Sequence, residues 1–289
     1  MTKRNPEYDF KWCPGCGDFG VKRAIELTVK ARTDELTIPM EDNVIVAGIG
    51  CSGNLVHLTD GPQPFGFHGI HGRTLPVAFG VKSANPDLQV MVVAGDGDFL
   101  SIGAEHIGPQ AKRNLDITCV IMDNGVYGLT KGQSSPTTQL GVVTSTTPGG
   151  KIEGEVKPFP LYLSLGVSFI ASAFSSKPKE MAEMIREAMD YPGFSVVHIQ
   201  SPCTTYNDTY EVLRGNAKKG IDPLTYDIPE NHDASNIDAA FDLVNAPGLP
   251  LGVVYRAENP SPLNERFDGL DRKKDSKDVH DLIEGFAIS

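Results

Sequence analysis

The sequence lacks the features that mark membrane, exported and nucleic-acid-binding proteins. Its 289 residues contain no apolar run of about 18 residues, the length that spans a bilayer, so we expect no transmembrane helix. The start, MTKRNPEYDF, holds no apolar core of a signal peptide. Acidic residues outnumber basic ones, 37 to 26, which argues against a general nucleic-acid binder. We therefore expect a cytoplasmic protein that binds neither membranes nor nucleic acids.

Cysteine is scarce, and its number is odd. Five cysteines without an export signal argue against a disulfide framework. Cys119 stands inside an apolar run and is predicted to be a small buried side chain. Cys13 and Cys16 form a C-x-x-C turn, which by itself fits zinc, a redox dithiol or an iron–sulfur ligand pair. Cys51 and Cys203 each follow an apolar strand, so four thiols match the four thiolates of a 4Fe–4S cluster.

Apolar runs alternate with helical patterns as far as residue 199. This alternation predicts an α/β fold with a mostly parallel sheet and helices on both faces. The expected strands are residues 43–49, 89–95, 116–122, 167–171 and 193–199. The expected helices are residues 17–32, 73–84, 101–114 (limited or kinked by Pro109), 161–166 and 179–189.

Two stretches do not fit this alternation. Residues 132–158 are rich in Ser, Thr, Gly and Pro and are predicted to form a long functional or mobile loop. Residues 204–289 are polar and weakly periodic, and we expect an irregular C-terminal extension. The division is therefore a cofactor-binding domain over residues 1–203 and an extension over residues 204–289.

The glycines of residues 48–53 match G-x-G-x-x-G, the pattern of a dinucleotide-binding turn. Such a turn should be followed, about 20 residues on, by an acidic side chain for the ribose. Residues 68–73 read His-Gly-Ile-His-Gly-Arg and contain no carboxylate. An NAD-dependent dehydrogenase is therefore a weak alternative.

Two polar motifs follow neighbouring predicted strands. Asp96, between Gly95 and Gly97, and Asn124 are separated by one strand–helix–strand unit, which brings both to the carboxyl ends of adjacent parallel strands. Their oxygens are hard ligands suited to Mg²⁺ with phosphate oxygens, and the glycines permit close approach of a diphosphate. Each motif alone fits an ordinary capped turn, but together they favour a metal–diphosphate site.

These motifs resemble the β subunit of the 2-oxoacid:ferredoxin oxidoreductases over residues 8 to about 210. The resemblance rests on five segments in order: residues 12–17, 48–53, 70–76, 95–98 and 123–133. It implies a thiamine-diphosphate-binding fold, with a 4Fe–4S cluster bound near the thiamine by Cys13, Cys16, Cys51 and Cys203. It also implies coenzyme-A-dependent, reversible oxidative decarboxylation of a 2-oxoacid, with electrons passing singly through the cluster to ferredoxin.

The resemblance also assigns individual residues. Asp96, Asn124 and the backbone carbonyl of Val126 would hold Mg²⁺, and Leu129 would support the bent thiamine. His68, His71 and Arg73 would meet the diphosphate or the substrate carboxylate, although each histidine also fits an ordinary loop residue. The full expected cofactor set is Cys51, Ser52, His68, Gly95, Asp96, Gly97, Asp98, Asn124, Val126, Gly128 and Leu129.

Substrate and partners are expected from the same resemblance. Lys131 is typical of the 2-oxoglutarate or broad-range branch and would attract a distal carboxylate; otherwise it is a surface lysine. No suitable motif carries the glutamate that thiamine enzymes need, so we expect an α or fused γα partner in a heterodimer that pairs again. The alternatives are a pyruvate or broad-range enzyme, a non-redox thiamine lyase or decarboxylase, and a non-catalytic cluster carrier.

Charge is unevenly spread along the chain. Residues 1–32 hold seven basic and four acidic side chains around the C-x-x-C turn, while the tail carries most of the negative charge. An electropositive N-terminal region would steer an acidic ferredoxin towards the cluster. The alternative is ordinary solvated surface.

Overall fold

The computed structural model describes residues 11–59 and 64–268, so Lys3 and Arg4 of the basic N-terminal region lie outside the described residues. Its strands are β1 (Asn43–Ala47), β2 (Phe65–His68), β3 (Gln89–Gly95), β4 (Ile117–Asp123), β5 (Val126–Tyr127), β6 (Gln133–Ser134), β7 (Phe169–Phe174), β8 (Phe194–Gln200), β9 (Thr225–Asp227) and β10 (Leu249–Arg256). Its α-helices are α1 (Asp18–Leu36), α2 (Leu55–Leu58), α3 (Thr74–Ala84), α4 (Ile107–Arg113), α5 (Pro158–Leu165), α6 (Pro178–Asp190), α7 (Tyr210–Arg214), α8 (Ile237–Asn245) and α9 (Leu263–Asp268). Within the described residues, no helix is both long and apolar enough to cross a membrane.

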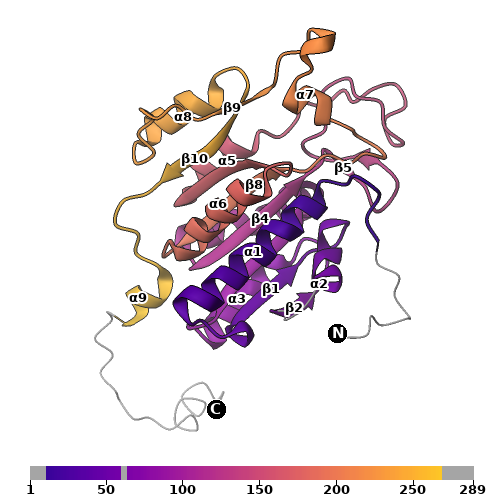
Figure 1. Cartoon of the computed structure of the whole chain (residues 1–289). Coiled ribbons are helices and arrows are strands. Elements are labelled where there is room, and N and C mark those ends of the chain that lie inside the picture. The colour runs from indigo at the N-terminus through magenta and orange to yellow at the C-terminus, as the bar shows by residue number, and fades with distance from the viewer. Residues whose placement is uncertain (1–10, 60–63, 269–289) are drawn as a thin grey trace, which may run out of the picture.

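One sheet of eight strands runs through the molecule in the order β2-β1-β3-β4-β8-β7-β10-β9 (Figure 1). The strands from β2 to β7 in this order pair in parallel, and β10 pairs antiparallel with β7. From β1 the chain runs to β2 on one side and then to β3 on the other. The expected α/β architecture is confirmed, and the direction of winding reverses between β1 and β3.

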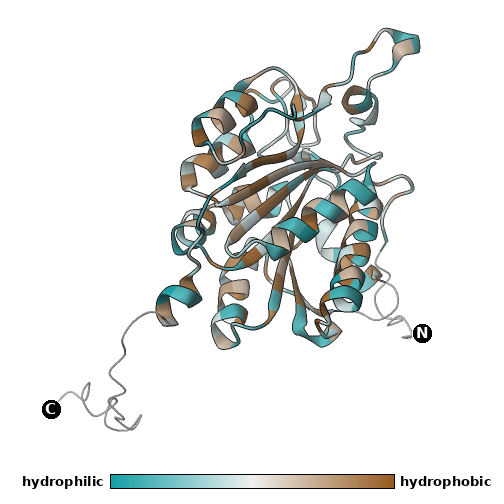
Figure 2. Ribbon diagram, turned by 60° about the vertical axis from the view of Figure 1, so that its left-hand side comes forward, coloured by the Kyte–Doolittle hydropathy of each residue, from teal (hydrophilic) through white to brown (hydrophobic). Residues whose placement is uncertain are grey.

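Helices cover both faces of this sheet. On one face, α1 and α6 lie side by side across the strands (Figure 1), and their inward residues pack with Ile45, Met91 and Val120. On the other face, α3, α4, α5 and α8 enclose a second core. The strands are apolar along most of their length, and the helices alternate between hydrophilic and hydrophobic stripes (Figure 2), as expected for a sheet buried on both sides.

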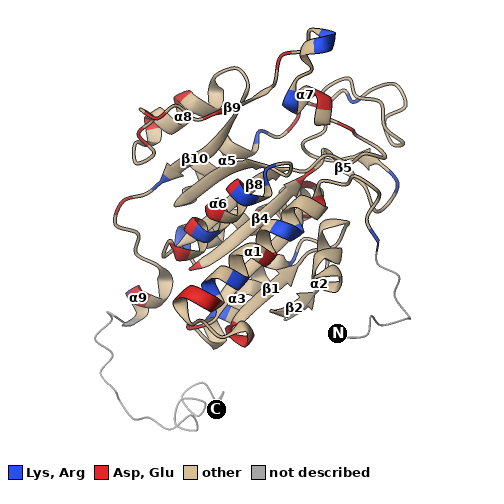
Figure 3. Ribbon diagram, in the orientation of Figure 1, with Lys and Arg blue, Asp and Glu red and all other residues tan. Residues whose placement is uncertain are grey.

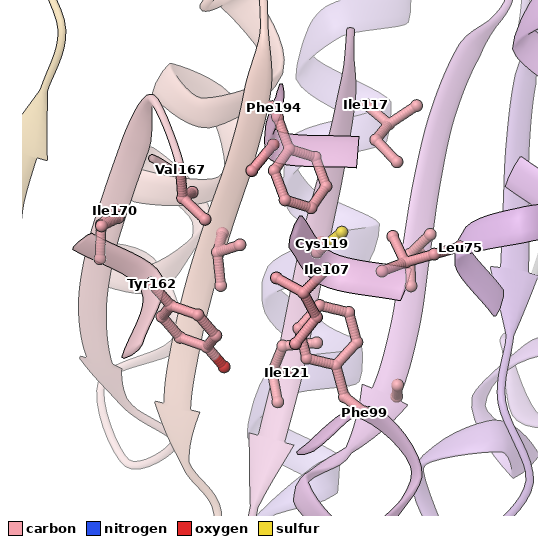
Figure 4. Packing of buried hydrophobic residues seen from close by; sticks show 14 of the residues in the cluster. Leu75, Phe99, Ile107, Ile117, Cys119, Ile121, Tyr162, Val167, Ile170 and Phe194 are labelled. Carbon is pink, nitrogen blue, oxygen red and sulfur yellow. The ribbon is translucent and has the colours of Figure 1, made fainter. Parts of the chain in front are cut away.

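Cys119 lies in the second core, in the middle of β4. Its side chain is fully buried and packs among Phe194, Ile107 and Leu75 (Figure 4). The expectation that this thiol is a small buried hydrophobic group is confirmed.

Three parts of the fold differ from the sequence-based expectation. The helix expected over residues 101–114 is divided into short helical turns followed by α4, which begins at Ile107. Pro109 has no backbone N–H to donate, so it is tolerated in the first turn of α4, where that group would have no partner within the helix. Residues 65–68, which lie outside every expected strand, form the edge strand β2. The tail is more regular than expected, since β10 extends the main sheet beside β7.

Residues 132–158 contain little regular secondary structure but are held by backbone hydrogen bonds. Gly141 N–H donates to the Lys151 carbonyl at 2.7 Å, and Lys151 N–H donates to the Val142 carbonyl at 2.9 Å. Farther along, Val156 N–H donates to the Pro136 carbonyl at 2.9 Å. The segment is therefore folded back on itself, with its ends close together.

Candidate functional site

The loops that carry the predicted site residues meet at one edge of the sheet. In the register, Ala47 of β1 pairs with Val93 of β3, and Gly95 of β3 pairs with Met122 of β4. Asp123 at the end of β4 then pairs with Gln200 of β8. Because these strands are parallel, their following loops all emerge at the same edge, where the winding reverses and ligands bind in open α/β sheets.

A cavity of about 190 Å³ opens between these loops. Eleven of the predicted site residues line it: Cys51, Ser52, His71, Gly95, Asp96, Gly97, Asp98, Asn124, Val126, Gly128 and Leu129. His68, Arg73 and Lys131 do not line it. Small-molecule sites usually measure about 300–1,000 Å³, so this chain encloses only part of a cofactor-sized ligand.

Asp96 and Asn124 face one another across the ends of β3 and β4. Asp96 is 1% exposed, and its Oδ1 lies 3.5 Å from the backbone N–H of Asn124. Asn124 Oδ1 accepts a hydrogen bond from Val126 N–H at 3.0 Å, which fixes the turn that carries the Val126 carbonyl. Burial, and then the neighbouring Asp123 carboxylate, raise the pKa of Asp96. A divalent cation would relieve both effects, so the donor set suits Mg²⁺.

The wall beside Asp96 fits the close approach of an anionic group. The hydroxyl of Ser52 is buried and, among the described residues, has no hydrogen-bond partner, so it can donate to a phosphate oxygen. A Cβ on Gly97 would lie 2.3 Å from the Tyr127 ring, and Tyr127 donates its hydroxyl to the Gly97 carbonyl at 3.2 Å. Only glycine therefore fits at position 97.

Asp98 holds His71 in the cavity wall. Asp98 Oδ1 lies 2.6 Å from His71 Nδ1 and accepts backbone N–H bonds from Gly72 at 2.8 Å and Ile49 at 3.0 Å. Because a carboxylate only accepts, Nδ1 of His71 is the donor. Asp98 thus fixes both loops and the orientation of the imidazole, through Nδ1 of His71.

The predicted residues outside the cavity have other partners. His68 Nδ1 lies 2.8 Å from His57 Nε2, and burial lowers the pKa of His68. The Arg73 guanidinium donates to the Ile102 carbonyl at 2.8 Å and lies 3.4 Å from Glu105. Lys131 is exposed beside the cavity rim and has a left-handed backbone, with φ of 79°.

The four loop cysteines converge beside this cavity. A Cβ on Gly128 would lie 3.3 Å from Cys51 Sγ and 3.9 Å from Cys203 Sγ, so both sulfurs face the same glycine. The Trp12 indole N–H donates to the Cys51 carbonyl at 2.7 Å. Hydrogen bonds also tie the turn of residues 13–16 to the Cys203 loop: Gly17 N–H to the Pro202 carbonyl, 3.1 Å, and the Thr204 hydroxyl to the Pro14 carbonyl, 2.9 Å.

The environment of the thiols is buried and acidic. Burial, and then the Asp18 carboxylate, raise the pKa of Cys51 to about 12 and raise the pKa of Cys16 still further. The charges of Cys51 and Cys203 also act on Cys16, which places these three groups close together. Thiols in such a site become thiolates only when a bound metal replaces the proton.

The cysteine, histidine and acidic side chains of the described residues are not arranged as a tight zinc site. Within residues 11–59 and 64–268, no three such side chains are gathered tightly enough to hold one metal ion. A zinc ion needs its thiolates within about 2.3 Å of one atom. A 4Fe–4S cluster instead takes its four thiolates on separate irons, which fits more widely spaced sulfurs.

Comparison with known proteins identifies the family. Residues 48–199 match the C-terminal TPP-binding domain of thiamine pyrophosphate enzymes, and residues 203–272 match the C-terminal part of the pyruvate ferredoxin oxidoreductase beta chain. The β subunit of 2-oxoacid:ferredoxin oxidoreductase from Saccharolobus solfataricus is 36% identical over 281 residues, covering 94% of this chain and 90% of that one. This chain belongs to the 2-oxoacid:ferredoxin oxidoreductase β subunits.

Two other similar proteins have names that specify 2-oxoglutarate. The 2-oxoglutarate synthase subunit KorB of Archaeoglobus fulgidus is 37% identical over 195 residues, covering 68% of this chain and 70% of that one. The solved structure of 2-oxoglutarate:ferredoxin oxidoreductase from Magnetococcus marinus, with 2-oxoglutarate, coenzyme A and succinyl-CoA bound, is similar with a TM-score of 0.85. It is 36% identical and covers 99% of this chain and 95% of that chain.

The β subunit also contains site residues that the sequence did not reveal. Asp18 lines the cavity, is 1% exposed and accepts a hydrogen bond from the Ser201 hydroxyl at 2.6 Å. Its only sequence signal was its place two residues after Cys16. Tyr127 and Thr130 line the cavity as well, beside Leu129.

Asp18 should make the stability of the β subunit depend on pH. Burial raises the pKa of Asp18 from 3.8 to about 6, and the hydrogen bonds from Ser201 and Cys16 lower it by a smaller amount. Between about pH 4 and 6 the Asp18 carboxyl is therefore protonated in the folded state and ionised in the unfolded state. The stabilisation is complete below about pH 4 and is lost as pH rises through about 6. The loss is up to about 3 kcal/mol.

This dependence can be measured by urea unfolding of the iron-free full chain between about pH 4 and 7. The wild type should lose stability relative to Asp18→Asn across this window, because the amide stays neutral. A difference between the two proteins that does not change with pH would contradict the assignment.

Proposed function

We propose that this β subunit binds thiamine diphosphate, Mg²⁺ and a 4Fe–4S cluster and oxidises 2-oxoglutarate with coenzyme A, passing electrons to ferredoxin. The observation that carries the proposal is the shared position of Asp96, Asn124 and Cys51, which line one cavity with Cys203 beside it. A metal–diphosphate site and a thiol that share one cavity fit a thiamine reaction coupled to electron transfer.

The diphosphate end of the cofactor would be held by this chain alone. Asp96 and Asn124 side chains and the Val126 carbonyl would bind Mg²⁺, and the free hydroxyl of Ser52 would donate to the diphosphate. When bound, thiamine diphosphate supplies the nucleophile and the electron sink for loss of carbon dioxide. Leu129, half-exposed at the cavity, would pack against its bent form.

His71 is the histidine among the described residues that line the cavity, and it would exchange a proton with the substrate. Its Nδ1 is fixed by Asp98, so its Nε2 would bind or release a proton at the cavity. The cavity is small, and its described lining contains no glutamate, which supports an α or fused γα partner that completes the site in a heterodimer. Coenzyme A would enter as co-substrate, as in the M. marinus enzyme, whose structure holds it.

The four cysteines would each bind one iron of the cluster and link the thiamine site to ferredoxin. Along α1, basic residues alternate with acidic ones (Figure 3), so this helix by itself is not uniformly positive. Lys22 lies 3.1 Å from Glu26, and Lys30 pairs with Asp34.

Two alternative functions each use only part of the site. A non-redox lyase would have no use for the four loop thiols, and a simple cluster carrier would not need the metal–diphosphate site.

Metal and cofactor analysis of the anaerobically purified enzyme tests this proposal. We expect about four iron and four sulfide per β chain, with bound thiamine diphosphate detected by mass spectrometry. Colourless protein with stoichiometric zinc would contradict the proposed iron–sulfur cluster. Protein that holds the cluster but does not bind thiamine diphosphate would favour the non-catalytic cluster carrier over the enzyme.

Single cysteine substitutions should separate the cluster ligands from the core thiol. Cys203→Ser should lose most of the iron, because one of four thiolates is removed. Cys119→Ser is the matched control and should keep the full iron content, since this side chain is buried in the second core. Equal iron loss in both variants would mean that the loss reflects misfolding and not ligation.

Lys131 would favour a dicarboxylate substrate by pairing with its distal carboxylate. Lys131→Ala in the assembled enzyme should lower kcat/KM for 2-oxoglutarate relative to pyruvate about 10- to 100-fold, the size of one charged hydrogen bond. Lys131→Arg, which keeps the charge, should change the ratio much less. An unchanged ratio in the Ala variant would favour a pyruvate or broad-range enzyme.

A further inference from the structure

A buried hydrogen-bonded chain lies behind Asp96, and the proposed function does not account for it. Tyr162 hydroxyl lies 3.1 Å from His198 Nδ1, and His198 Nε2 lies 2.9 Å from Asp123 Oδ2. Thr137 Oγ1 lies 2.7 Å from Asp123 Oδ1 and 2.7 Å from Asp96 Oδ2. The chain thus runs from the core to the carboxylate expected to bind Mg²⁺.

The Thr137 hydroxyl bridges the Asp96 and Asp123 carboxylates. A hydroxyl carries one proton and can donate to only one carboxylate at a time. Asp123 already accepts from the His198 ring at Oδ2 and from Gly125 N–H at Oδ1, 3.0 Å. Each Asp123 oxygen therefore already has a partner, and we assign the Thr137 proton to Asp96 Oδ2.

Thr137 is held in place by a buried lysine. Lys151 is 5% exposed, and its ammonium donates to the carbonyls of Ser135 at 3.2 Å, Pro136 at 3.3 Å and Thr138 at 2.7 Å. These carbonyls belong to the residues on both sides of Thr137. One ammonium therefore fixes the whole turn from residue 135 to 138.

A second anchor sets where this turn sits. The Thr138 hydroxyl accepts from Ser135 N–H at 2.7 Å and donates to the Gly125 carbonyl at 2.5 Å. Gly125 directly follows Asn124, the other expected Mg²⁺ ligand. The turn is thus fastened to the same strand end that carries the metal site.

We propose that Lys151 and Thr137 are positioning residues that set the Mg²⁺ affinity of the thiamine diphosphate site. The proposal rests on the proposed function, in which Asp96 binds Mg²⁺. Lys151 holds the turn, the turn presents the Thr137 hydroxyl, and the hydroxyl orients the Asp96 carboxylate. Hydrogen-bond partners of this kind typically change metal affinity about 10- to 100-fold when they are removed.

Calorimetric titration of thiamine diphosphate into the metal-free assembled enzyme, at a series of Mg²⁺ concentrations, tests this. Thr137→Val should raise the half-saturating Mg²⁺ concentration about 10- to 100-fold. Thr137→Ser restores the hydroxyl and should stay within about twofold of wild type. Lys151→Met should act in the direction of Thr137→Val, while Lys157→Met, an exposed lysine of the same segment, should have no effect.

A double variant tests whether the two residues act through one contact. Thr137→Val with Lys151→Met should change the Mg²⁺ requirement little more than the larger single change, because both remove the same hydrogen bond. Fully additive effects would overturn the positioning role of Lys151. Iron content should stay at the wild-type value, which separates a local effect from general misfolding.

The outcomes also separate this inference from the proposed function. If wild type needs Mg²⁺ and Thr137→Val has the same requirement, the inference is wrong and the proposed site stands. If Thr137→Ser is as weak as Thr137→Val, the hydroxyl is not the active group and the inference is wrong. If wild type binds thiamine diphosphate without Mg²⁺, both the metal site and the inference fall.

Discussion

The parallel pairing of β1, β3, β4 and β8 is the constraint on which the rest of this protein depends. Parallel strands all end at the same edge, so the loops after them share one small space although they are far apart in sequence. Cys51, Asp96, Asn124 and Cys203 each belong to a different one of these loops. At this edge the winding reverses between β1 and β3, so the loops after these two strands run in opposite directions and leave a cavity between them.

The same edge gathers negative charge in a buried place. Asp18, Asp96, Asp98 and Asp123 are each at most 6% exposed. Asp98 and Asp123 are each paired with a histidine, at His71 and His198, and the remaining two have raised pKa values. Burial of an uncompensated carboxylate is costly. A cation at Asp96 would offset this cost, and the Asp18 carboxylate adds to burial in raising the pKa of the Cys16 and Cys51 thiols.

Much of the fold and part of the site could be predicted from the sequence. β3 was predicted at its observed bounds, and the Asp96–Asn124 spacing placed both residues in one cavity because a strand–helix–strand unit has a nearly fixed reach. Local patterns failed where context decided. β2 and β10 are short or partly exposed strands whose pairing depends on β1 and β7. The sequence also did not reveal that His68 and Arg73 contact His57 and Glu105, and their role as ligands stays a prediction.

By itself, the sequence determined which chemical groups are available: four loop thiols and one core thiol, a carboxylate and an amide after apolar strands, and glycines that admit a ligand. These properties follow from residue type and spacing and do not depend on how the side chains pack. Only the tertiary structure decided which groups act together. Lys151 and Thr137 carry no motif, and their relation to Asp96 exists because a long loop folds back over the end of β4. A hydrogen bond depends on distances of a few tenths of an ångström, which packing sets and spacing along the chain does not.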